Sequence, residues 1–158
     1  TGQPKFPLQA YQELPDPAAP SDKEWAAVTI TQVSWGTTDV RYAKHGLPRL
    51  KNQQTIALKG WRGERVNAQA VVWTGVELKD LNFSFGDFKD KKGNVLPQDA
   101  FTGGFVRYVM TDELNKDGRG ACGHRKAVDY DSLLVADPID TSLKAMALPA
   151  RTVQPVWV

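Results

Sequence analysis

The sequence contains a single cysteine, Cys122, which excludes an internal disulfide and leaves the redox compartment open. Its apolar runs are short, as in Ala70-Val71-Val72-Trp73, whereas a membrane-spanning helix needs roughly 20 apolar residues. Neither charge dominates, because 20 Lys and Arg residues stand against 18 Asp and Glu residues, and a net charge of +2 does not attract a polyanion. These absences exclude a disulfide scaffold and a membrane-spanning helix, and they argue against a nucleic-acid partner.

The two ends of the chain differ from its middle. Residues 1–24 contain Pro4, Pro7, Pro15, Pro17 and Pro20, and each proline removes a backbone donor and favours an extended neighbour. We predict an irregular arm or linker over residues 1–24 and one domain over residues 25–158, a length that can bury a core. The last seven residues read as a strand with no closing turn, which indicates a fragment of a longer chain.

Short segments rich in β-branched and aromatic residues recur along the domain, and no segment sustains a helical apolar period. In residues 65–74 the smaller side chains Val66, Ala68, Ala70 and Val72 share one face, which we predict to pack inward. The segments predict an all-β fold, a sandwich of two antiparallel sheets. The predicted strands are residues 28–35, 55–60, 65–74, 81–88, 104–110, 133–136, 143–148 and 153–158, with a charged turn at residues 90–94.

Asp112 and Glu113 form an adjacent acidic pair. Paired carboxylates can divide the roles of general acid and stabiliser in sugar chemistry. Adjacent residues of a strand point to opposite faces, however, so the two carboxylates share a site only if a bulge redirects one of them. A solvated turn is the alternative, and we predict no catalytic residue in this chain.

Residues 113–118 alternate oxygen-bearing side chains before a glycine, as the first half of a calcium loop does. The position that would hold the bidentate Glu is His124. An ordinary loop is the alternative, so we predict no metal and no other cofactor, and calcium binding here stays an open question. Cys122 and His124 lie two residues apart without a third group to orient the imidazole, so we assign them no nucleophile and base roles.

Five tryptophans offer flat faces that can stack on sugar rings or fill a β-sandwich core, namely Trp25, Trp35, Trp61, Trp73 and Trp157. Core packing is the usual role of so large a side chain. If any of these residues contacts a glycan, Trp61 and Trp73 are the candidates that we select as carbohydrate-binding residues.

The stretch Lys59-Gly60-Trp61-Arg62-Gly63-Glu64-Arg65-Val66-Asn67-Ala68-Gln69 resembles the N-terminal β-sandwich domain of enzymes similar to glycoside hydrolase family 123. Residues 81–88, the turn at residues 92–94, the strand at residues 104–110 and the final segment from residue 148 follow in the order typical of that domain. The resemblance covers residues 28–158 and depends on this overall pattern, not on one diagnostic motif.

In that family the sandwich precedes a (β/α)₈ barrel, which carries an adjacent Asp-Glu pair and removes N-acetylgalactosamine by substrate-assisted retention. The resemblance therefore implies that this chain is a non-catalytic accessory domain of a glycoside hydrolase-like, carbohydrate-active bacterial protein, secreted or periplasmic. Its expected partner is the downstream catalytic barrel of the same parent chain, with glycans as a further candidate. The alternatives are an independent carbohydrate-binding module that uses exposed Trp residues, and an enzyme that acts through Asp112 and Glu113.

Overall fold

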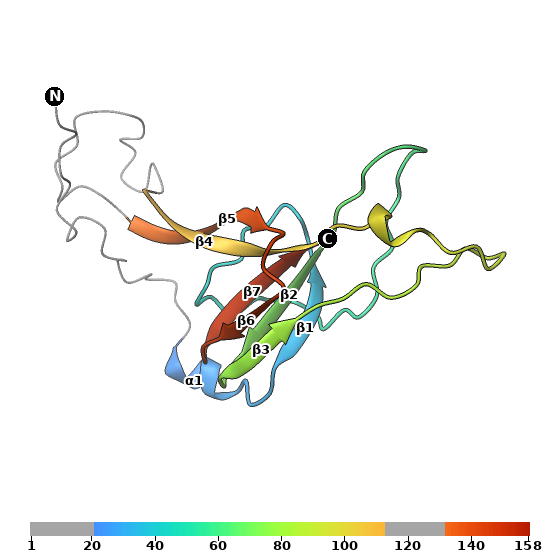
Figure 1. The fold of residues 1–158 in the computed structure, drawn as a ribbon. Coiled ribbons are helices and arrows are strands. Elements are labelled where there is room, and N and C mark those ends of the chain that lie inside the picture. The colour runs from blue at the N-terminus through green and yellow to red at the C-terminus, as the bar shows by residue number, and fades with distance from the viewer. Residues whose placement is uncertain (1–20, 113–131) are drawn as a thin grey trace, which may run out of the picture.

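The computed structural model describes residues 21–112 and 132–158, which form two antiparallel β-sheets (Figure 1). The larger sheet has the strand order β1-β2-β7-β4-β5, and the smaller sheet pairs β3 with β6. The strands are β1 Gln32–Gly36, β2 Gln69–Thr74, β3 Leu78–Asn82, β4 Gly104–Asp112, β5 Ser132–Asp140, β6 Ala145–Leu148 and β7 Thr152–Trp157. The helical elements are α1 Asp22–Ala26 and the 3₁₀ turn η2 Gln98–Ala100. The predicted all-β, two-sheet antiparallel sandwich is confirmed.

Strand β2 lies inside the larger sheet, between β1 and β7, and both of its faces are covered. Val71 and Trp73 belong to the main core cluster, whose other members are Trp25, Val28, Tyr42 and Val153. On the opposite face Val72 is buried as well, whereas Val66 precedes the strand and is exposed. Ala68 and Val72 of the predicted inward face are thus buried, and the larger side chains Val71 and Trp73 on the other face are buried as well, because the core cluster covers that face.

The smaller sheet covers the face of the larger sheet that carries Phe105. In the register between β4 and β7, Phe105 lies opposite Val156, and both side chains are buried. The ring of Phe83, just after β3, meets the ring of Phe105 edge to face with a centroid separation of 5.3 Å. Leu148 at the end of β6 is also buried. The two sheets thus share one apolar layer, as expected for a sandwich.

Helix α1 begins where the sequence predicted an irregular arm. The Ser21 hydroxyl accepts a hydrogen bond from the Glu24 backbone, and the Glu24 carboxylate accepts one from the Ser21 backbone N–H, which is a complete capping box. Trp25 is buried and donates its indole N–H to the carbonyl of His45 at 3.1 Å. The first strand consequently starts at Gln32 and not at residue 28, because the chain must first leave this helical turn.

Residues 55–60 form no strand, in contrast to the prediction. Ile56 is half-buried and Leu58 is exposed, and no strand within residues 21–112 and 132–158 pairs with this stretch. The predicted strand at residues 81–88 also shifts, because the ladder of β3 ends at Asn82, opposite Ala145. The remaining predicted strands correspond to β4, β5, β6 and β7, with β5 extending to Asp140.

Candidate functional site

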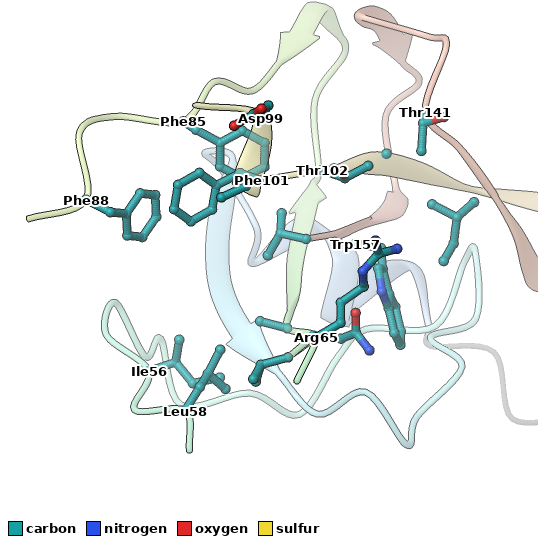
Figure 2. Close-up of a pocket in the computed structure, with 18 of the residues that line it drawn as sticks. Ile56, Leu58, Arg65, Phe85, Phe88, Asp99, Phe101, Thr102, Thr141 and Trp157 are labelled. Atoms are coloured by element: carbon teal, nitrogen blue, oxygen red, sulfur yellow. The ribbon is translucent and has the colours of Figure 1, made fainter. Parts of the chain in front are cut away.

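A cleft of about 600 Å³ lies at the end of the larger sheet where β2 begins and β7 ends. Figure 1 shows two loops, residues 55–66 and residues 85–101, that project from the same end of the molecule beside the label of the C-terminus. Side chains from both loops line the cleft, together with Trp35, Ile139, Trp157 and Val158 (Figure 2). The site is therefore assembled from five separate parts of the chain.

A ladder of phenylalanines forms one wall of the cleft. Phe85 and Phe101 stack with a centroid separation of 5.6 Å, and Phe101 and Phe88 stack at 4.1 Å with an interplanar angle of 21°. Figure 2 shows these three rings together on one side of the cleft. Phe83 lies behind Phe85, edge to face at 6.0 Å, so the ladder connects the layer between the sheets to the surface. Phe88, at its outer end, is 46% exposed.

The loop of residues 85–101 is held as a hairpin by a capped turn. Lys89 forms a bridge with Val95, and the Leu96 N–H donates to the Phe88 carbonyl at 2.9 Å. The Asp90 carboxylate accepts hydrogen bonds from the side chain and backbone of Asn94, and these bonds lower the pKa of Asp90. The hairpin thereby holds Phe88, Val95 and Leu96 in exposed positions.

The opposite loop presents Trp61 on a tight turn. The Trp61 N–H donates to the Glu64 carboxylate at 2.6 Å, and the Glu64 N–H returns a bond to the Trp61 carbonyl at 3.0 Å. Gly63 adopts φ +85°, a left-handed conformation that glycine accommodates without strain. The turn leaves the Trp61 side chain 86% exposed, while Ile56, Leu58 and Val66 of the same loop line the cleft.

The cleft carries few charged groups. Within the described residues its charged lining side chains are Arg65 and Asp99, to which Asn67, Thr102 and Thr141 add neutral polar groups. In residues 21–112 and 132–158 no group of three or more His, Cys, Asp or Glu side chains is placed to hold a metal ion. Two carboxylates with a lowered pKa cap local structure instead. Hydrogen bonds from Ser21 lower the pKa of Glu24 at the start of α1, and a hydrogen bond from the Ser142 hydroxyl lowers that of Asp140 at the turn after β5.

Comparison with known proteins gives this fold a family. The sequence model of the family described as "Glycoside hydrolase 123 N-terminal domain" matches residues 35–158. This chain belongs to that family. The resemblance that the sequence suggested is thus confirmed. In this family the catalytic part is a separate domain.

Among solved structures, the glycoside hydrolase 123 N-terminal domain described here is similar to a family 123 glycoside hydrolase from Clostridium perfringens, whose structure was analysed for glycolipid glycan hydrolysis. The TM-score is 0.60 and the sequence identity 16%, a likeness of fold. The match covers 82% of this chain and 21% of that one, so the chain spans about a fifth of its length. A search of curated protein sequences found no match. Along the described ranges of the chain, no helix is long and apolar enough to cross a membrane.

The structure separates the two tryptophans selected as carbohydrate-binding residues. Trp73 is 4% exposed and packs in the main core cluster, so its faces are not free to stack on a sugar. The expectation of an exposed ring at Trp73 needs correction, because this face of β2 is covered by the cluster that contains Trp25, Tyr42 and Val153. Trp61 is exposed on its turn, and a carbohydrate-binding role for it stays a prediction.

The remaining sequence candidates are not among the described residues that line the cleft. Asp112 ends β4, whereas Glu113, the rest of the 113–118 loop, Cys122 and His124 lie outside the described residues. Sequence reasoning also missed the phenylalanine ladder. The sequence did contain a signal for it. The charged turn at residues 90–94 is flanked by the apolar residues Phe88, Val95 and Leu96, which a turn exposed to solvent does not need.

Proposed function

We propose that this chain is the non-catalytic, accessory β-sandwich domain of a glycoside hydrolase and that it packs against the catalytic domain of the same parent protein. The observation that carries the proposal is the family match over residues 35–158, to a domain that precedes the catalytic part. The character of the cleft agrees with this role. Glycoside hydrolysis generally uses two carboxyl groups that flank the scissile bond, and among the described lining residues Asp99 bears the one carboxylate.

The test compares this chain with the full-length parent protein on glycans that end in N-acetylgalactosamine. Release of free sugar is measured for both proteins at equal molar concentration, and a heat-inactivated parent sample gives the background. We expect turnover by the parent and none by residues 1–158. Turnover by the isolated chain would contradict the proposal and would direct attention to Asp112 and Glu113.

A second candidate function, that of an independent carbohydrate-binding module, is favoured by Trp61. An aromatic side chain 86% exposed on a hydrogen-bonded turn resembles a preformed stacking platform for a sugar ring. The test is a tryptophan-fluorescence titration of the chain with a panel of glycans, alongside Trp61→Ala and the ring-preserving variant Trp61→Phe. If fluorescence stays unchanged across the whole panel, this candidate is removed.

We also propose that the parent protein acts outside the cytoplasm, as a secreted or periplasmic bacterial enzyme. The support is the family's association with glycan substrates, which are met outside the cell. Fractionation of the producing cells with an antibody against this chain tests the location. A signal confined to the cytoplasmic fraction would refute it.

A further inference from the structure

The backbone direction at the end of β7 is fixed by its neighbour. Val158 and Ala68 exchange two backbone hydrogen bonds, of 2.9 Å from the Val158 N–H and 2.8 Å from the Ala68 N–H. Before them, Trp157 pairs with Gln69 on one side and with Gly104 on the other. Because β7 is held from both sides at Trp157 and by Ala68 at Val158, residues that follow it emerge at a defined place. Both Trp157 and Val158 line the cleft, so that place is the cleft itself.

The surface around this exit point is unusually apolar for a solvent-facing end of a domain. Phe88, Val95 and Leu96 are exposed on the hairpin of residues 85–101, and Leu58 and Val66 are exposed on the facing loop. Exposed apolar residues that gather in one place mark contact surfaces, whereas scattered ones need no explanation. The hydrogen bonds of the Asp90 turn hold the hairpin in shape, so this surface is formed before any partner is present.

We infer that the cleft binds the polypeptide that follows Val158. This junction to the catalytic domain lies between the hairpin of residues 85–101 and the loop of residues 55–66, and its apolar side chains pack against the phenylalanine ladder. The inference rests on the proposed function, which supplies the following domain. The occupant is assigned from the position of Val158 in the cleft wall and from the chain's share, about a fifth, of the length of the similar hydrolase. A sugar would leave its many hydroxyl groups facing a wall with few polar partners.

Hydrogen–deuterium exchange of the full-length parent and of residues 1–158 tests this assignment without reference to activity. Residues 55–66 form no regular ladder, so their backbone amides are expected to exchange fast in the isolated chain. In the parent, we expect slower exchange over residues 55–66 and 85–101 and unchanged exchange over residues 27–31, at the opposite end of the sheet (Figure 1). Equal exchange of both loops in the two proteins would overturn the inference.

A matched pair of variants adds a second readout. Phe88→Ser changes an exposed residue of the cleft wall, and Ile30→Ser changes an exposed apolar residue at the other end of the molecule. In the parent, we expect Phe88→Ser to speed proteolysis at the junction after Val158 about tenfold and Ile30→Ser to leave it unchanged. Both variants are expected to unfold within a few degrees of the unsubstituted protein when made in residues 1–158. Equal proteolysis of the two parent variants would contradict the docking.

Other occupants give different results. Self-association of residues 1–158 in sedimentation equilibrium, lost in Phe88→Ser, would assign the cleft to a second copy and overturn the inference, as would a glycan that protects the two loops from exchange. The two proposals also fail separately. Loop protection in a parent that hydrolyses no glycan would leave the docking in place and remove the glycosidase role, whereas hydrolysis by the parent without loop protection would do the reverse.

Discussion

The phenolic hydroxyl of Tyr108 on β4 lies 2.9 Å from the backbone carbonyl oxygen of Val153 on β7 and 3.0 Å from that of Tyr42. Beyond Phe105 the pairing of β4 with β7 ends, and the Val153 N–H of β7 donates instead to the carbonyl of Lys44, in the loop that contains Tyr42, at 2.8 Å. Burial raises the pKa of Tyr108 well above its ordinary value, so the hydroxyl remains a donor to these carbonyls. One side chain thus fastens an irregular loop to the interior of the larger sheet.

Replacing this hydroxyl tests that fastening. We expect Tyr108→Phe to lower the free energy of unfolding by about 1–2 kcal/mol, because two partly buried carbonyl groups lose their donor while the ring still fills its space. Urea denaturation at neutral pH measures the change. Val109→Ala, at the exposed neighbouring position of β4, serves as the control and should change the free energy by less. An unfolding free energy equal to that of the unsubstituted protein would contradict the proposed role of the hydroxyl.

The two tryptophans selected from the sequence should differ sharply in their effect on stability. Trp73→Ala removes a ring from the core cluster and is expected to cost about 3–5 kcal/mol of unfolding free energy. Trp61→Ala removes a ring that is mostly in water, and we expect a change within about 0.5 kcal/mol. Thermal denaturation followed by far-ultraviolet circular dichroism compares the two variants. Similar losses at both positions would mean that Trp61 packs against the domain.

The contrast between these tryptophans shows which features of the fold can be predicted from the sequence. Period-two alternation is a local property, and it correctly placed β4 and β7 to within two residues at either end. Burial depends on what packs against each face of a strand. Trp73 is buried in a cluster with Trp25, Tyr42 and Val153, residues that lie far from it in the sequence. No local pattern carries that information.

The same limit explains the loop of residues 55–66 and the cleft. Residues 55–60 have strand-like composition, but a strand exists only where a partner backbone is available, and no strand in the described part of the chain pairs with them. The ladder of Phe85, Phe101 and Phe88 joins residues on both sides of the hairpin turn, so its geometry follows from the turn. By contrast, the capping box of Ser21 and Glu24 was readable in the sequence, and the interpretation of the prolines before it obscured α1.

The glycine beneath the phenylalanine ladder offers a test of the cleft wall. A Cβ atom on Gly103 would lie 2.6 Å from the Phe83 ring and 2.9 Å from the Phe85 ring. We therefore expect Gly103→Ala to push these rings apart and to destabilise the fold by about 1–3 kcal/mol, measured by urea denaturation. Gly86→Ala is the matched control, since its added Cβ would meet no atom within 4 Å. Equal stability of both variants would show that the rings yield without strain.

The turn after β5 should make part of the stability depend on pH. Asp140 accepts hydrogen bonds from the Ser142 hydroxyl at 2.6 Å and from two backbone N–H groups, and its second oxygen lies 3.5 Å from Arg107. The Ser142 hydroxyl is the largest cause of the lowered pKa of Asp140. A carboxyl group with a lower pKa in the folded state stabilises the fold above its unfolded value of about 3.8, and this contribution is lost as the pH falls through the folded value.

Asp140→Asn removes this titrating group while keeping an oxygen acceptor in the turn. We expect the variant to be less stable than the unsubstituted protein at about pH 7, and the difference to shrink as the pH approaches about 3 and below, because protonation then removes the same charge from Asp140. Urea midpoints across this range measure the convergence. Asp137→Asn, on the same strand, loses an exposed ion pair with Arg41 and should change the midpoint little at any pH. A difference between Asp140→Asn and the unsubstituted protein that persists undiminished at the lowest pH would show that the loss comes from turn geometry and not from the carboxylate charge.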